Sequence, residues 1–127
     1  MDKAASTIGV LVADDHPTVR AGLVSLLTTA ADIEIIATAR DGAEAVALAA
    51  EHNPDVVLMD LSMPKVCGAE ATRRIVAADC QARILILTAF GDRAHIGAAL
   101  EAGAVGYLLK DSDPKTLIGA VRAAATS

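Results

Sequence analysis

The sequence IGVLVADDHP occupies residues 8–17 and joins an apolar run to a helix start through two consecutive aspartates. Its first part, Ile8–Ala13, lacks polar alternation, which indicates a strand covered on both faces of a parallel sheet. Pro17 suits the first turn of a helix. The order of buried strand, acidic turn and helix is typical of an α/β protein.

Further apolar runs predict four more strands, at Ile33–Ala39, Val56–Met59, Ile84–Leu87 and Val105–Leu109. Helical stripes with a spacing of three or four lie between them, at Val19/Leu23/Leu26/Leu27, Ala71/Ile75/Ala78 and Leu117/Ile118/Val121. Asp92 and Ser112/Asp113 are expected as helix N-caps, and Asn53-Pro54 and Ala102-Gly103 mark helix ends. Five strand–helix units with right-handed crossovers predict a three-layer α/β sandwich in one domain, residues 1–127, although periodicity leaves the strand order open.

The composition and charge of the chain exclude several classes of protein. The chain has 127 residues, 54% hydrophobic and 21% charged, which excludes a disordered or low-complexity protein. The net charge of −5 and the lone aromatics Phe90 and Tyr107 argue against direct contact with nucleic acid or an anionic membrane. Cys67 and Cys80 show no metal or disulfide spacing, and no signal peptide or run of about 18 apolar residues is present, so a cytoplasmic location is expected.

Polar residues stand where the predicted strands end. Asp14 and Asp15 follow the first strand, Asp60 the third, Thr88 the fourth and Lys110 the fifth. The carboxyl ends of parallel strands share one edge, where ligands bind, so these side chains should converge. Two carboxylates about 4 Å apart repel each other by about 4 kcal/mol at an effective dielectric constant near 20. A single lysine does not offset the mutual repulsion of three carboxylates. A divalent cation with oxygen ligands, foremost Mg²⁺, is therefore expected.

This chemistry suits a phosphoryl group, because a carboxylate such as Asp60 can form an aspartyl-phosphate. Thr88 and Lys110 could bind the remaining phosphoryl oxygens. Taken singly, each residue also has an ordinary explanation: Asp15 as a cap or turn residue, Lys110 as a surface lysine, Thr88 as a strand-end cap. The coincidence at five positions favours a site. No glycine pattern of a nucleotide site is present, and the three histidines, His16, His52 and His95, are too spread to predict a metal cluster.

Four motifs resemble the response-regulator receiver domain of bacterial two-component signalling over the whole chain: VADDHP at 12–17, LMDLSMP at 58–64, LTAF at 87–90 and GYLLKD at 106–111. DDHP and GYLLKD are similar to the NarL/FixJ branch, whose members usually carry a LuxR-type helix-turn-helix domain. The resemblance implies a flavodoxin-like (βα)5 fold with strand order 2-1-3-4-5. It also implies that Asp60 accepts a phosphoryl group from a sensor histidine kinase.

By the same resemblance, Asp15, Asp60 and the backbone carbonyl of Ser62 hold Mg²⁺, and Asp14 acts mainly through water. Thr88 and Lys110 contact the phosphoryl oxygens, and Tyr107 is the aromatic switch. The domain would not act as an enzyme on other substrates, but would catalyse its own phosphoryl transfer and autodephosphorylation.

The resemblance also implies partners. Phosphorylation would favour a homodimer, and DNA would be reached through a C-terminal output domain that these residues do not contain. We therefore expect a receiver cut from a longer regulator, rather than a stand-alone receiver. Phe90 is bulkier than the polar residues often found two positions after the threonine, which should alter the access of water to the phosphoryl group.

Two rival functions use similar chemistry. A Mg²⁺-dependent phosphohydrolase with an aspartate nucleophile needs a second aspartate two residues later as general acid, and position 62 is serine. A flavin-binding flavodoxin-like module needs a phosphate-binding loop after the first strand, where Asp14 and Asp15 would instead repel the phosphate of FMN. The sequence therefore favours the signalling domain over both.

Overall fold

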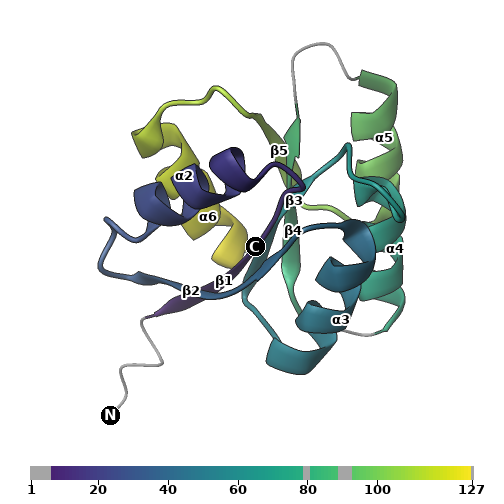
Figure 1. Cartoon of the computed structure of the whole chain (residues 1–127), viewed down its shortest axis with the longest axis horizontal. Coiled ribbons are helices and arrows are strands. Elements are labelled where there is room, and N and C mark those ends of the chain that lie inside the picture. The colour runs from purple at the N-terminus through teal and green to yellow at the C-terminus, as the bar shows by residue number, and fades with distance from the viewer. Residues whose placement is uncertain (1–6, 79–80, 89–92, 127) are drawn as a thin grey trace.

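The structure is a computed structural model that describes residues 7–78, 81–88 and 93–126. Within these ranges five strands alternate with five helices (Figure 1). The strands are β1 (Ile8–Ala13), β2 (Ile33–Ala39), β3 (Val56–Asp60), β4 (Arg83–Thr88) and β5 (Gly106–Leu109). The helices are α2 (Pro17–Leu27), α3 (Gly42–His52), α4 (Gly68–Ala77), α5 (Arg93–Ala102) and α6 (Pro114–Ala125).

The strands form one parallel sheet in the order β2-β1-β3-β4-β5, which confirms the flavodoxin-like prediction. Helices α2 and α6 cover one face, and α3, α4 and α5 cover the other (Figure 1). The chain winds outward from β1 to β2 and then returns past β1 to β3. The winding direction therefore reverses between β1 and β3, and ligands of open α/β sheets bind at the carboxyl ends of the strands beside such a point.

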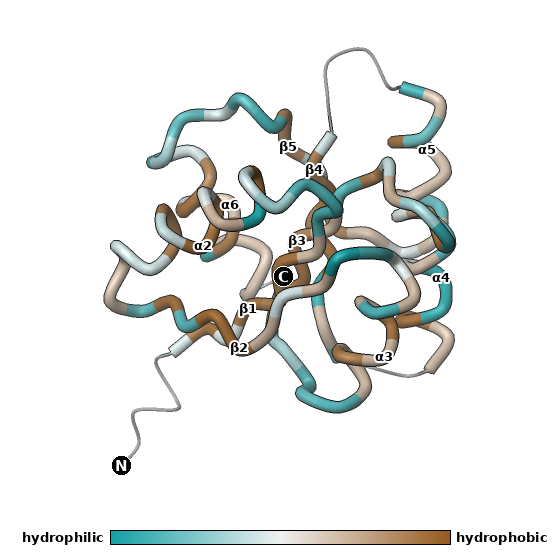
Figure 2. Tube along the Cα trace, in the orientation of Figure 1, coloured by the Kyte–Doolittle hydropathy of each residue, from teal (hydrophilic) through white to brown (hydrophobic). Residues whose placement is uncertain are grey.

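The core consists of two apolar layers, one on each side of the sheet. Alternate residues of β1 supply both, because Leu11 packs in the layer below α3, α4 and α5, and Val10 in the layer below α2 and α6. Every residue of β3 is buried, and the hydrophobic strands run through the middle of the molecule (Figure 2). The sheet interior is therefore rigid and close-packed, which suits a platform that must hold side chains at its edge.

The predicted strand limits are confirmed for β1 and β2 and differ slightly elsewhere. Strands β3 and β4 each continue one residue further, so that Asp60 and Thr88 are their last residues. Strand β4 also begins one residue earlier than predicted, at Arg83, and β5 begins one residue later, at Gly106. Asp60 pairs with Leu87, so the pairing between β3 and β4 extends one residue beyond the apolar run Val56–Met59. Strands β2 and β5 are partly exposed, against the expectation of cover on both faces, because they are the edges of the sheet.

Most predicted helix ends are confirmed. Pro17 opens α2, and the Asp113 side chain accepts a hydrogen bond of 2.8 Å from the Thr116 N–H at the start of α6. Asn53 ends α3 in the left-handed region, with φ of 49°. Helix α5 ends at Ala102, and Gly103 follows with φ of +123°, a conformation that glycine tolerates.

Two members of the predicted helical stripes are not in the core. Val19 is 37% exposed, and Ala78 lies beyond the end of α4 on the surface. The predicted N-cap Asp92, Phe90 and Cys80 lie outside the described residues.

Candidate functional site

Three of the predicted residues converge at the carboxyl edge of the sheet. Asp14 directly follows β1, Asp60 ends β3 and Lys110 directly follows β5. The Lys110 Nζ atom lies 3.1 Å from Asp60 Oδ1 and 3.3 Å from Asp14 Oδ2. One ammonium thus bridges two carboxylates from different strands, as the strand-end argument predicts.

The two aspartates of this cluster are charged groups that are almost completely buried. The Asp14 and Asp60 residues are 0% and 1% exposed, whereas the Lys110 side chain is 26% exposed. Burial raises the pKa of Asp60, and the hydrogen bond to Lys110 lowers it. The negative charge of Asp14 raises it further, so the net pKa of Asp60 is raised. Burial lowers the pKa of Lys110, but Asp60 and Asp14 outweigh it, so that the net pKa is raised. The cluster therefore carries more negative charge than Lys110 alone compensates.

Several carboxylate oxygens of the cluster lack hydrogen bonds. Among the described residues, the buried atoms without a hydrogen-bond partner are Asp14 Oδ2, Asp15 Oδ1 and Asp60 Oδ2. One donor atom each from Asp14, Asp15, His16 and Asp60 lies within 4.8 Å of the others. Asp14 Oδ2 still lies 3.3 Å from Lys110 Nζ, and Asp15 Oδ1 lies 3.2 Å from His16 Nδ1. A buried carboxylate oxygen without a hydrogen bond is costly, and a hard divalent cation suits such oxygens. The residues therefore fit a cation such as Mg²⁺.

The turn after β1 is held by hydrogen bonds between side chains and the backbone. The Asp14 Oδ1 atom accepts a hydrogen bond of 2.9 Å from the His16 N–H, and the Asp14 carbonyl accepts one of 2.8 Å from Arg20 Nη1. The N-cap position of α2 belongs to His16, whose side chain makes no capping hydrogen bond with any described residue. The capping interpretation of Asp15 is therefore wrong, and its carboxylate, 27% exposed, is available to the site.

His16 is the residue at the site that the sequence analysis did not assign to it. Its Nδ1 atom lies 3.2 Å from Asp15 Oδ1 and 3.4 Å from Asp14 Oδ1. The wide spacing of the three histidines argues against their meeting one another, but it does not bear on whether one of them lies beside carboxylates. Its position directly after Asp14 and Asp15 was the available signal.

The loop that follows β3 lies close to the Asp60 carboxylate. The Ser62 N–H donates a long hydrogen bond of 3.4 Å to Asp60 Oδ1, so the Ser62 backbone adjoins the carboxylate. The Gly68 N–H donates to the Leu61 carbonyl over 2.9 Å, and a Cβ atom on Gly68 would lie 2.5 Å from the Asp60 carbonyl oxygen. Only glycine allows this approach of α4 to the end of β3.

The two predicted switch residues lie in different surroundings. Thr88 is 1% exposed at the end of β4, and its carbonyl accepts a hydrogen bond of 2.9 Å from the Lys110 N–H. Tyr107 pairs with Ile86 on the edge strand β5 and is 50% exposed. The structure thus brings Thr88 to the site and leaves the Tyr107 ring at the surface.

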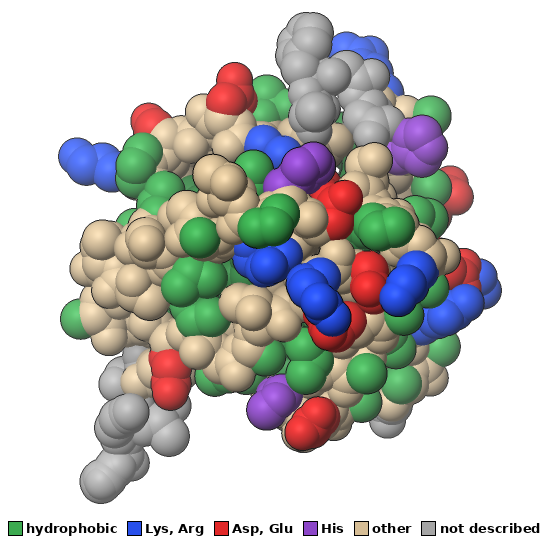
Figure 3. Space-filling model, viewed as in Figure 1, with side chains coloured by type: hydrophobic (Ala, Val, Ile, Leu, Met, Phe, Trp, Pro, Cys, Tyr) green, Lys and Arg blue, Asp and Glu red, His purple; other side chains and the backbone are tan. Residues whose placement is uncertain are grey.

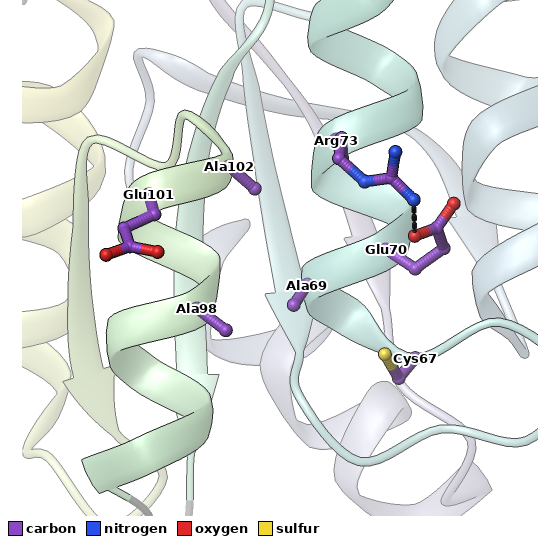
Figure 4. Close-up of a pocket in the computed structure, with 7 residues that line it drawn as sticks. All are labelled: Cys67, Ala69, Glu70, Arg73, Ala98, Glu101 and Ala102. Carbon is purple, nitrogen blue, oxygen red and sulfur yellow. Dashed lines mark hydrogen bonds and ion pairs between the residues drawn. The ribbon is translucent and has the colours of Figure 1, made fainter.

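A separate hollow of about 430 Å³ lies between α4 and α5 (Figure 4). Its lining is largely alanine, Glu70 is already paired with Arg73, and Glu101 turns away from α4 in this view. It offers few polar groups to orient a ligand, so the carboxylate cluster remains the better candidate.

Acidic, basic and histidine side chains are interspersed on the face shown in Figure 3. The helices within the described ranges are all too short or too polar to cross a membrane.

Comparison with known proteins agrees with this geometry. Residues 10–122 match the Response regulator receiver domain family. The chain is 46% identical over 114 residues to the transcriptional regulatory protein LnrK of Bacillus subtilis, covering 90% of this chain and 52% of that protein. It is 46% identical over 117 residues to LiaR of the same organism, covering 92% and 56%. The chain thus spans about half the length of the curated relatives it matches.

Solved structures show the same fold. The receiver domain of the putative response regulator NarL from Mycobacterium tuberculosis superposes with a TM-score of 0.92 at 35% identity, covering 96% of this chain and 98% of that one. A LuxR-family response regulator from Aurantimonas superposes with a TM-score of 0.89 at 43% identity, covering 95% and 86%.

Proposed function

The chain belongs to the response-regulator receiver domain family, and on that premise we propose that Asp60 accepts a phosphoryl group from a sensor histidine kinase in the presence of Mg²⁺. One observation carries the proposal most directly. Asp60 is a buried carboxylate with Lys110 Nζ at 3.1 Å and an oxygen, Oδ2, that makes no hydrogen bond to the described residues. Such a group is poised for a cation and for chemistry rather than for stability.

In the transfer, a bond forms between a carboxylate oxygen of Asp60 and phosphorus, and the bond from phosphorus to the kinase histidine nitrogen breaks. The electron pair of that bond stays on the leaving imidazole, which takes up a proton. Asp14, Asp15, Asp60 and the Ser62 carbonyl would hold Mg²⁺, which supplies positive charge against the phosphoryl oxygens. Thr88 ends β4 and Lys110 follows β5, and both side chains would donate hydrogen bonds to those oxygens.

The phosphorylated domain would act as a switch on a transcriptional output. The relatives named above are transcriptional regulators of which this chain covers 52% and 56%, which supports an output region outside the receiver. In this proposal the domain catalyses only its own phosphorylation and dephosphorylation, and DNA is contacted by the output region.

The test is incubation with Mg²⁺ and acetyl phosphate, a small phosphoryl donor, followed by intact-mass measurement. We expect one added phosphoryl group, absent when Mg²⁺ is chelated and absent in Asp60→Asn. Asp111→Asn is the matched control, since this aspartate is exposed and next to Lys110, and it should be labelled like the wild type. Persistent labelling of Asp60→Asn would refute the assignment.

Asp15→Asn tests the cation site separately. We expect weaker Mg²⁺ binding by calorimetry and slower labelling, because one carboxylate ligand is lost. The Tm without Mg²⁺ should hold or rise, since repulsion with Asp14 and Asp60 is relieved. A large fall in Tm would show instead that Asp15 is structural.

A further inference from the structure

The imidazole of His16 lies beside the carboxylates of Asp14 and Asp15. We propose that His16 is a ligand that lets this site bind borderline transition-metal cations, of which Zn²⁺ is the representative, in preference to Mg²⁺. This inference rests on the cation site of the proposed function. It adds His16 as a ligand of that site and a preference for Zn²⁺ over Mg²⁺.

Geometry supports shared ligation. Two donor atoms bound to one Zn²⁺ at about 2.0–2.2 Å are separated by roughly 3.0–3.4 Å, depending on whether they span an octahedral or a tetrahedral edge. The His16 Nδ1 atom lies 3.2 Å from Asp15 Oδ1 and 3.4 Å from Asp14 Oδ1. The imidazole nitrogen and both carboxylates can therefore meet one ion with little rearrangement.

An independent observation points to a ligand at this place. Asp60 is 1% exposed, yet its Oδ2 atom has no hydrogen-bond partner among the described residues. Asp60 and His16 both belong to the group whose donor atoms lie within 4.8 Å of one another. The His16 side chain is 64% exposed, so its ring remains accessible to an ion from solvent.

Ligand chemistry supplies the selectivity. Mg²⁺ takes oxygen ligands and water, and gains little from an imidazole. Zn²⁺ and its neighbours in the first transition row bind imidazole readily and bind mixed nitrogen and oxygen sites more tightly. Occupancy by such an ion would exclude Mg²⁺ from the carboxylates that both share.

The experiment measures the binding of Zn²⁺ alone and of Mg²⁺ alone by calorimetry, at about pH 8, where a free imidazole is neutral. All proteins carry Cys67→Ser and Cys80→Ser, so that thiols do not compete for Zn²⁺. His16→Gln is compared with the parent and with the matched control His52→Gln, which removes a histidine at the end of α3. In the parent, NMR of the histidine ring nitrogens is recorded with each ion.

We expect His16→Gln to lower Zn²⁺ affinity about 10- to 100-fold and Mg²⁺ affinity less than about twofold, while His52→Gln changes neither. The His16 ring nitrogen signal should shift with Zn²⁺ and not with Mg²⁺. Unchanged Zn²⁺ affinity in His16→Gln would overturn the proposal. Equal losses for both ions would also overturn it, because they would show that the ring acts only by orienting Asp15.

The same samples separate this inference from the proposed function. If His16 is not a ligand, the labelling of Asp60 with Mg²⁺ and acetyl phosphate still tests the proposed function. If Asp60 is not labelled, the Zn²⁺ affinities of the parent and of His16→Gln still test the role of His16.

Discussion

Asp60 is a residue on which two requirements conflict. Phosphoryl transfer needs an ionised carboxylate, while burial at the end of β3 favours the neutral acid. Lys110 only partly resolves the conflict, because burial and the charge of Asp14 together keep the pKa of Asp60 above its ordinary value of 3.8. The residue that we propose as the phosphoryl acceptor is therefore expected to cost stability in the absence of a cation.

This cost predicts how the stability of Asp60→Asn depends on pH. A carboxyl whose pKa is raised by folding contributes its full stability below about pH 3.8 and loses it as pH rises through the raised pKa. Asparagine does not ionise, so the variant should gain on the wild type over that interval, by about 1.4 kcal/mol for each unit of pKa difference, and then hold the gain. Urea unfolding without Mg²⁺, between about pH 3 and pH 8, measures this.

Lys110 keeps a partner in that variant, because Asp14 Oδ2 lies 3.3 Å from its Nζ atom. The control Asp111→Asn should follow the wild-type pH profile. A variant that is less stable than the wild type throughout, with no divergence above pH 3.8, would show that the Asp60–Lys110 pair is a net stabilising interaction instead.

At the scale of elements, the strand ends explain why so much of the site could be predicted. Asp14, Asp60 and Lys110 meet because every carboxyl end of a parallel sheet lies at one edge, and apolar runs in a sequence reveal where those ends are. Periodicity is a property of the backbone repeat, so it predicts strands and helices well. The ladder hydrogen bonds do not depend on side-chain polarity, which is why Asp60 and Thr88 proved to be inside their strands.

Side-chain direction in turns and at sheet edges could not be predicted in this way. The approach of His16 to Asp15 depends on how the turn after β1 is folded by hydrogen bonds to Asp14. The exposure of Tyr107 depends on β5 being an edge strand, and strand order came only from the family resemblance. These features follow from tertiary contacts rather than from a local repeat.

Helix α4 supplies a prediction at this scale. Gly68→Ala would place a Cβ atom 2.5 Å from the Asp60 carbonyl oxygen and 2.8 Å from Leu61 Cα. These are backbone atoms, so the end of β3 or the start of α4 must move. We expect a loss of about 1–3 kcal/mol in the free energy of unfolding and weaker Mg²⁺ binding, measured by urea unfolding and calorimetry.

Gly97→Ala is the matched control in α5. A Cβ atom there meets nothing within 4 Å, so the higher helix propensity of alanine should raise stability by up to about 1 kcal/mol. Wild-type stability and Mg²⁺ affinity in Gly68→Ala would mean that the contact at the end of β3 relaxes freely.

For the whole molecule, we expect activation to favour self-association. The domain carries a net charge of −5, which disfavours its direct binding to DNA. Strand β5 and the residue before it expose the apolar side chains Val105, Tyr107 and Leu109, which a partner could cover. Light scattering should show a shift toward dimer when Mg²⁺ and beryllofluoride, a phosphoryl mimic, are added, and none in Asp60→Asn. A monomer under both conditions at high concentration would contradict this.

The signal must also leave the site, and Thr88 and Tyr107 offer a route. A phosphoryl group adds close to two negative charges and strong acceptor oxygens, which the Thr88 hydroxyl can approach from the adjacent strand end. Movement of Thr88 would vacate space beside β4, and the Tyr107 ring, 50% exposed on β5, could turn inward to fill it. Since a switch requires differential interactions in its two states, Thr88→Ala should retain Asp60 labelling but lose the beryllofluoride-induced change in amide exchange across α5 and β5. A full wild-type change in Thr88→Ala would rule this route out, whereas loss of the change in Tyr107→Ala as well would assign both residues to it.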